Sequence, residues 1–171
     1  MSFPEDLVIR FAVPGDSAAI LGFIRELAEY EHLLPEVVAD EAAIRTTLFG
    51  VRPAAEVLIA ELAGAPIGFA LFFPSYSTFL AKPGLYLEDL FVRSTARGKG
   101  VGAALMSALA RIAMQRNYGR FEWSVLDWNA PALDFYKRLG ARMKSEWTIH
   151  QLVGEPLAAL AEQWPHPVGK T

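Results

Sequence analysis

The spacing of apolar residues along the chain predicts alternating strands and helices. Apolar runs of roughly four to eight residues, bounded by Gly, Pro or Asp, indicate buried strands. Apolar residues three and four positions apart, such as Ile20, Phe23, Ile24 and Leu27, indicate helices that pack one face against a sheet. The strands expected from these patterns cover residues 7–13, 56–62, 66–73, 85–92, 121–126 and, as a region that need not be continuous, 143–152.

The expected helices fill the stretches between these strands. They cover residues 17–30, 40–49, 101–116, a segment that Asn129 caps and Gly140 follows, and 155–163. A hairpin turn is expected at 63–65 and a loop over 74–83. Because no repeat or linker divides the chain, residues 1–171 are expected to form a single α/β domain with a mixed sheet flanked by helices.

The composition supports a sizeable core and excludes several classes of function. Hydrophobic residues make up 53% of the 171 residues and charged residues 20%, which is typical of a folded domain. The net charge of -3 and the pI near 5.6 argue against a nucleic-acid partner. The absence of Cys excludes disulfides, thiolate metal ligands and a Cys nucleophile, and the His residues at 32, 150 and 166 lack metal-ligand spacing.

The N-terminal residues do not resemble a targeting segment. They lack a basic stretch followed by an apolar run, and no apolar stretch approaches the roughly 20 residues that span a bilayer. We therefore expect a cytoplasmic protein without membrane partners and without a metal.

The turn that opens the predicted helix at 101 is the most informative stretch. Glycines at 98, 100 and 102 allow close approach to the backbone, and Arg97 and Lys99 place cations at a helix N-terminus, where phosphate binds readily. These glycines are also consistent with a tight connection alone. A nucleotide-triphosphate loop does not fit, because Lys99 is followed by Gly100 rather than by Ser or Thr. A dinucleotide-binding turn is disfavoured because no repeated parallel βαβ pattern surrounds it.

Two motifs resemble the GCN5-related N-acetyltransferases (GNAT). Arg97-x-x-Gly100-x-Gly102 matches the family's Arg/Gln-x-x-Gly-x-Gly/Ala signature, and the stretch from Asn129 to Gly140, which includes Phe135-Tyr136, matches its Asn-x-x-Ala/Ser-x-x-Phe-Tyr-x-x-x-Gly pattern. The similarity runs from about Ile9 to Ala161. It implies the family's fold, a mixed, mostly antiparallel, twisted sheet with helices on both faces.

The resemblance is closer still to the diamine acetyltransferases, the branch that holds the spermidine/spermine and thialysine N-acetyltransferases. Residues 24–31 and 86–92 carry it, and 126–129 look closer to the thialysine branch. The polyamine enzymes have an Asp and a Trp in the loop before their catalytic strand, where this chain reads Tyr-Ser-Thr-Phe at 76–79. This departure favours a shorter amino acid or diamine over a polyamine.

The resemblance implies acetyl-coenzyme A as co-substrate, a homodimer, and a role for each site residue. Glu88 would remove the proton of the amine and Tyr136 would protonate the leaving thiolate. The residues expected to bind the co-substrate are Leu90, Phe91, Val92, Arg97, Gly98, Lys99, Gly100, Val101, Gly102, Ala103, Asn129, Ala132, Tyr136 and Leu139. Those expected near the amine are Tyr30, Glu31, Glu88, Asp89, Glu122, Trp123 and Ser124, with Trp123 also consistent with packing.

Strand geometry constrains the adjacent carboxylates Glu88 and Asp89. Successive side chains of a regular strand point to opposite faces, so both cannot face one cleft. Either a bulge re-aims one of them or one serves the structure. We expect Glu88 to act in the chemistry and Asp89 to bind or orient the substrate.

The sequence thus predicts direct acetyl transfer from acetyl-coenzyme A to the primary amine of a small cationic substrate. An alkyl ammonium must first lose its proton, since its pKa lies near ~10.4. The alternatives are an acetyltransferase of protein lysines or N-termini, and a coenzyme A-binding module without catalysis.

Overall fold

The computed structural model describes residues 3–164, 166 and 168, in two compact units formed by residues 1–124 and 125–171. We describe each unit by itself, and the single domain stays a prediction. In the described part of the chain, no helix is long and apolar enough to cross a membrane.

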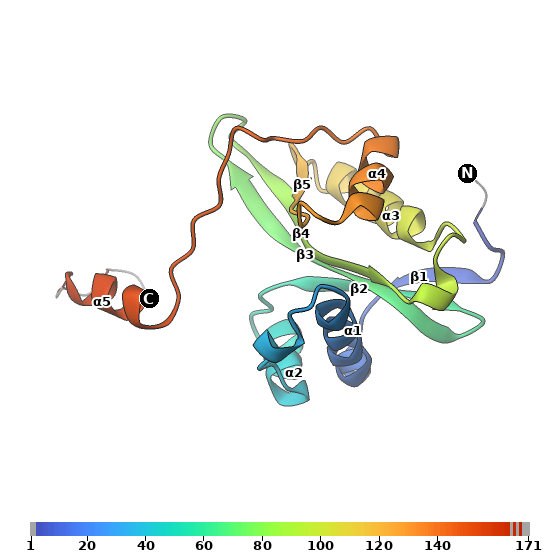
Figure 1. Ribbon diagram of the computed structural model, residues 1–171, viewed down its shortest axis with the longest axis horizontal. Coiled ribbons are helices and arrows are strands. Elements are labelled where there is room, and N and C mark those ends of the chain that lie inside the picture. The colour runs from blue at the N-terminus through green and yellow to red at the C-terminus, as the bar shows by residue number, and fades with distance from the viewer. Residues whose placement is uncertain (1–2, 165, 167, 169–171) are drawn as a thin grey trace. The chain divides into compact units, whose positions relative to one another are not determined.

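The first unit is built on a mixed sheet of five strands in the order β1-β2-β3-β4-β5 (Figure 1). Every neighbouring pair is antiparallel except β4 and β5, which are parallel. The parallel step follows from the long connection through α3, since parallel neighbours need a crossover. The strands are β1 (Leu7–Phe11), β2 (Glu56–Leu62), β3 (Ala65–Ser77), β4 (Lys82–Val92) and β5 (Phe121–Trp123).

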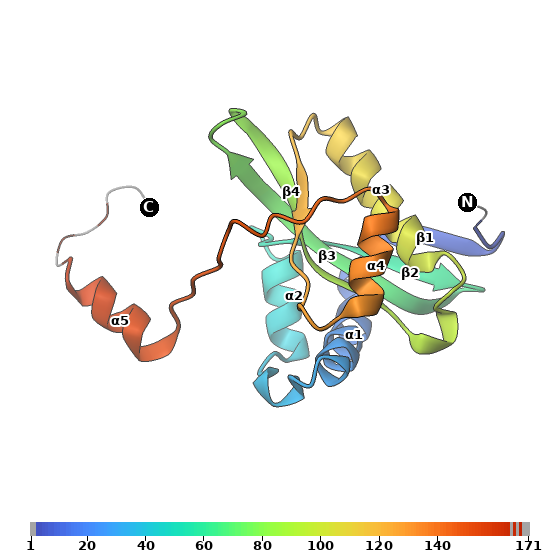
Figure 2. The same ribbon diagram turned by 45° about the horizontal axis from the view of Figure 1, so that its top comes forward.

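Helices cover both faces of this sheet, as the resemblance implied. Helices α1 (Ser17–Tyr30) and α2 (Glu41–Phe49) lie on one face and α3 (Val101–Gln115) on the other (Figures 1 and 2). Short 3-10 turns precede α1 (η1, Pro14–Asp16), follow it (η2, Leu34–Glu36) and precede the turn into α3 (η3, Ser94–Ala96). The mixed α/β fold is confirmed.

Each face of the sheet has its own apolar core. On the α1 face, Phe23 stacks on Phe69 with ring centroids 5.5 Å apart and also contacts Phe91. On the α3 face, apolar side chains of helix and strands are 0–1% exposed, namely Leu85, Leu87, Leu105 and Leu109. Complete burial of a Leu or Phe side chain contributes ~1.5–3 kcal/mol, so these two cores hold β4 firmly between helices.

Two predicted boundaries in the middle of the chain are wrong. The expected loop at 74–83 is largely strand, since β3 continues to Ser77 and β4 begins at Lys82. Pro74 does not end β3, although Pro removes a backbone donor. Since β2 begins at Glu56 opposite Phe72, Pro74 lies beyond β2 and has only β4 as a neighbour, as on an edge strand.

The second unit contains α4 (Ala130–Arg138) and α5 (Gly154–Glu162). The strand predicted over 143–152 is wrong, because these residues form no strand. Their apolar residues are spaced suitably, but a strand requires a hydrogen-bonded neighbour, and the described part of this unit holds no second strand. The strand expected at 121–126 also ends early, at Trp123.

Candidate active site

A bulge in β4 separates Glu88 from its neighbours. Leu71 of β3 pairs with Asp89, but the next residue, Phe72, pairs with Leu87, so Glu88 is an extra residue without a partner. The bulge shifts the alternation of side chains by one position. Asp89 therefore shares a face with Tyr86, and this face packs against α1 and α2. Of the two predicted alternatives, the bulge is confirmed.

The bulge gathers carboxylates at the end of α1. Burial, together with the negative charges of Glu88 and Glu31, raises the pKa of Asp89 to about 6. Burial also raises the pKa of Glu31, which follows the last residue of α1. Glu88 itself is exposed at the bulge. The charges of Glu88 and Glu31 thus disfavour ionisation of Asp89, and a cation bound beside these three carboxylates would favour it.

Next to the bulge, β4 has an open edge. The pairing of β4 with β5 ends at Leu87 and Trp123, whereas β4 continues to Val92. The N–H of Arg93 donates to the carbonyl oxygen of Ile67 in β3. Because the backbone groups of successive strand residues point to alternate sides, the N–H and C=O groups of Leu90 and Val92 point away from β3. Among the described residues, the N–H groups of Leu90 and Val92 have no backbone acceptor at this edge, whereas the C=O of Val92 accepts a hydrogen bond from Nε of Arg97 at 2.8 Å. The N–H groups and the C=O of Leu90 suit pairing with an extended ligand chain.

The open edge leads to the glycine turn. Gly98 and Gly100 have φ angles of +75° and +83°, which disfavour any residue with a Cβ, and Gly100 is the N-cap of α3. Within the described residues, none of the backbone N–H groups from Gly98 to Ala103 donates to a protein acceptor. A row of unpaired N–H groups at a helix N-terminus is suited to bind a diphosphate. The turn and its neighbours Lys99, Val101 and Gly102 thus lie where the sequence placed them.

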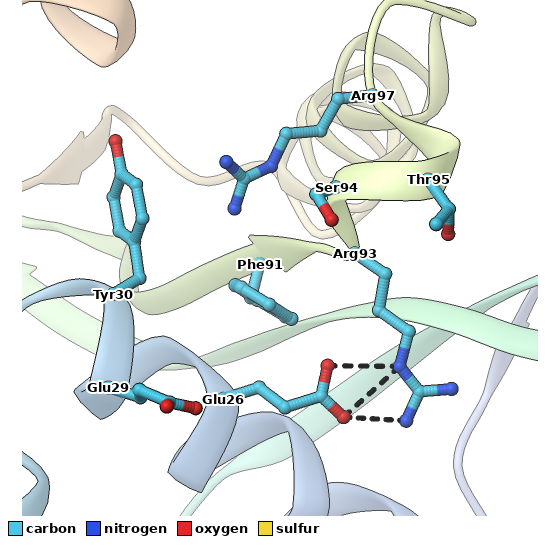
Figure 3. Close-up of a pocket in the computed structure, with 8 residues that line it drawn as sticks. All are labelled: Glu26, Glu29, Tyr30, Phe91, Arg93, Ser94, Thr95 and Arg97. Carbon is cyan, nitrogen blue, oxygen red and sulfur yellow. Dashed lines mark hydrogen bonds and ion pairs between the residues drawn. The ribbon is translucent and has the colours of Figure 1, made fainter.

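A pocket of about 400 Å³ lies between the end of α1 and this turn (Figure 3). Its lining includes three residues with predicted roles, Tyr30, Phe91 and Arg97. The sequence did not identify the rest of the lining, which consists of Glu26, Glu29, Arg93, Ser94 and Thr95. Only Glu26 carried a signal in the sequence, since it lies four residues before Tyr30 and so on the same side of α1.

The predicted residues of β5 are held by neighbours in the first unit. The carboxylate of Glu122 forms an ion pair with Nε of Arg120 at 2.7 Å. The ring of Trp123 contacts Phe121, with centroids 4.9 Å apart. The hydroxyl of Ser124 lies 2.8 Å from that of Tyr86, so it bridges the two strands where they begin to separate.

The remaining predicted residues lie on α4 in the second unit. The side chain of Asn129 accepts a hydrogen bond from the N–H of Ala132 at 3.3 Å and caps the helix, as predicted. With spacings of three, four and three residues, Asn129, Ala132, Tyr136 and Leu139 follow one stripe of the helix. The ring of Tyr136 contacts that of Phe135, with centroids 5.2 Å apart.

No group of three or more His, Asp or Glu residues in the described part of the chain is arranged to hold a metal ion.

Known proteins resemble this chain over most of its length. The model of the Acetyltransferase (GNAT) family matches residues 23–141. The thialysine N-epsilon-acetyltransferase of Sus scrofa is 39% identical, over 91% of this chain and 97% of the relative. The L-ornithine N5-acetyltransferase NATA1 of Arabidopsis thaliana is 34% identical, over 89% and 86%. An integron cassette protein from the mobile metagenome of V. cholerae has a similar structure, with a TM-score of 0.79 and 28% identity over 93% and 99% of the two chains.

Proposed function

Because the chain belongs to the GNAT acetyltransferase family, we propose that it transfers the acetyl group of acetyl-coenzyme A to the primary amine of a small cationic molecule. The observation that carries this choice of acceptor is the acidic face, formed by Glu31, Glu88 and Asp89 at the β4 bulge. The charges of Glu31 and Glu88 disfavour ionisation of Asp89 there, and a bound ammonium group would favour it.

The parts of the first unit that suit the acyl donor follow one another along the chain. The open edge of β4 at Leu90 to Val92 offers backbone groups to the amides of the pantetheine arm. The unpaired N–H groups from Gly98 to Ala103 suit its diphosphate. The thioester would then lie near the bulge, next to the carboxylates.

We propose that Glu88 and Asp89 act as a pair in removing the proton. A general base works best when its pKa lies near the working pH, and Asp89, with a pKa of about 6, meets that condition. Glu88, exposed at the bulge, passes the proton to water. The amine nitrogen then forms a bond to the acetyl carbon as the carbon–sulfur bond breaks.

The proton for the departing thiolate is assigned to Tyr136. This assignment rests on the Phe135-Tyr136 motif of the family and on the phenol's capacity to donate a proton.

The names of the relatives support an amino acid with a side-chain amine as acceptor. They are enzymes of thialysine and of L-ornithine, each a small molecule with a primary amine at the end of a short chain. Tyr30 and Glu31, with Glu122 and Trp123 on β5 and Ser124 directly after it, are the residues proposed to surround this acceptor. The homodimer, the cytoplasmic location and the lack of nucleic-acid, membrane and metal partners stay predictions from the sequence.

The test is release of coenzyme A from acetyl-coenzyme A across a panel of amines. The panel holds thialysine, ornithine, lysine, putrescine, spermidine and an N-terminal peptide. We expect turnover to be fastest with the amino acids that carry a side-chain amine and to fall at least tenfold in Tyr136→Phe. Turnover of the peptide alone would contradict the proposal in favour of a protein substrate, and binding of acetyl-coenzyme A without any turnover would favour a non-catalytic module.

A further inference from the structure

The side chain of Arg97 is held in place by α1 and β4. Its Nε donates to the carbonyl oxygen of Val92 at 2.8 Å. Its guanidinium carbon lies 4.9 Å from the ring centre of Tyr30 and 5.7 Å from that of Phe91. Figure 3 shows the guanidinium lying across the pocket, between Tyr30 at the end of α1 and the start of the glycine turn. Each of these contacts restrains a side chain that otherwise has many rotamers.

These contacts leave the outer donors of Arg97 available. Among the described residues, no hydrogen bond or ion pair involves either Nη atom of Arg97. Arg93, the other arginine of the pocket, differs because its Nε and Nη2 bind Glu26 and its Nη1 binds the carbonyl of Pro66. Arg97 is therefore the pocket arginine whose paired Nη donors can meet an anion.

Arg97 also begins the turn whose N–H groups are unpaired. An anion bound to the N–H groups from Gly98 to Ala103 lies one residue away from the backbone of Arg97. A guanidinium that is already oriented loses less conformational freedom on binding than a mobile one. The ring of Tyr30 supplies part of that orientation.

We propose that Tyr30 is a positioning residue for the anionic part of the acyl donor and acts through Arg97. The proposal rests on the proposed function, since it takes the donor to be a thioester with a diphosphate group. It gives Tyr30 a role beyond the amine site assigned from the sequence. Because Tyr30 precedes Glu31, whose charge acts on Asp89, one end of α1 serves both substrates.

The test measures binding of coenzyme A by calorimetry, without turnover. A cation–π contact at a partly exposed site changes a dissociation constant by about two- to fivefold. Tyr30→Leu removes the ring and is expected to raise the Kd of coenzyme A by this factor. Tyr30→Phe keeps the ring and is expected to leave the Kd at the wild-type value. Tyr30→Met replaces Tyr30→Leu if that variant does not fold.

A double-mutant cycle separates this role from a general effect on α1. Gln also occurs at the Arg97 position of the motif, so Arg97→Gln keeps the turn but removes the cation. In an Arg97→Gln background, Tyr30→Leu is expected to cause no further increase in the Kd.

Equal Kd values for wild type and Tyr30→Leu, with a raised KM for the amine alone, would overturn the proposal. Additive effects in the double variant would also overturn it. A wild-type chain that does not bind coenzyme A would instead overturn the proposed function.

Discussion

The ionised carboxylate of Asp89, which the proposed reaction requires, destabilises the folded chain. Burial and two like charges raise its pKa from 3.8 to about 6. Between pH 3.8 and about pH 6, the folded chain therefore holds a proton on Asp89 that the unfolded chain has largely released. The contribution of Asp89 to stability is therefore complete below pH 3.8 and is lost as the pH rises through about 6. At neutral pH the ionised carboxylate destabilises the fold.

Replacing Asp89 by Asn is accordingly expected to stabilise the chain while lowering its activity. The pKa difference corresponds to a gain of ~1–3 kcal/mol in the free energy of unfolding at pH 7.5. In a chain of this size, each kcal/mol raises Tm by about 2–4 °C. Thermal unfolding at pH 7.5 and pH 4 checks this, because the gain should nearly vanish at pH 4. A lower Tm at pH 7.5 would contradict this expectation, because it would show that the Asp89 carboxylate stabilises the fold.

The pH profile of kcat/KM tests which carboxylate controls the reaction. If deprotonated Asp89 is required, kcat/KM for the amine rises with pH through about 6. Glu88→Gln removes the like charge that most raises this pKa, so the acid limb should move to lower pH while the plateau falls. Glu36→Gln, a charge change on η2 that does not act on Asp89, should leave the limb in place. An unmoved limb in Glu88→Gln would assign it to another group.

The sequence predicts that Glu88 acts in the chemistry and Asp89 binds or orients the substrate, but it could not show whether a bulge re-aims one of them. Strand alternation allowed either a bulge or a single functional carboxylate, because a bulge depends on how the partner strand pairs. The pairing of Leu71 with Asp89 and of Phe72 with Leu87 is a property of two strands together. Tyr30 and Glu31 were readable as a motif, whereas the contact between Tyr30 and Arg97 joins elements 67 residues apart.

At the scale of elements, the glycine turn shows how backbone conformation sets a binding surface. Gly100 has a φ of +83°, and a Cβ there costs roughly 1–2 kcal/mol. Gly100→Ala is expected to raise the Kd of coenzyme A about tenfold, because the turn must adopt another conformation and its N–H groups lose their common direction. Calorimetry checks the affinity and thermal unfolding checks the fold.

Gly22 offers the matched control for that variant. It lies within α1, and a Cβ built on it meets no atom within 4 Å. Since Ala is favoured over Gly inside a helix by ~0.5–1 kcal/mol, Gly22→Ala should unfold at the same or a higher temperature and bind coenzyme A normally. Equal affinity in both variants would mean that the turn does not bind the diphosphate.

The elements themselves were largely predictable where a local pattern decides them. The stripe of apolar residues in α3 and the Asn cap of α4 act within a few residues of the chain. The predictions of a loop at 74–83 and of a strand over 143–152 failed because no local pattern decides them. Whether Pro is tolerated in a strand, or an apolar run becomes one, depends on a neighbouring strand that a single segment does not reveal.

At the scale of the whole molecule, charge distribution matters more than net charge. The formal net charge is only -3, so the overall field attracts cations weakly. The attraction that counts is local, from carboxylates gathered at one end of α1 and one bulge of β4. The glycine turn with Arg97 and Lys99 presents the opposite sign at the other end of the same open edge. The proposed donor and acceptor would therefore meet regions of opposite charge.

Salt should then weaken amine binding through the local carboxylates. The screening length falls to about 10 Å at 0.1 M salt, so with acetyl-coenzyme A saturating, the KM of a dicationic amine should rise severalfold between 0.02 and 0.2 M salt, values taken as roughly spanning that screening range. Glu31→Gln should flatten this rise because it removes one of the charges. Glu5→Gln changes the net charge equally but lies near the N-terminus, away from the site, so its salt dependence should match the wild type. If both variants flattened the rise alike, the attraction would come from the net charge, and the acidic face would lose its role in choosing the acceptor.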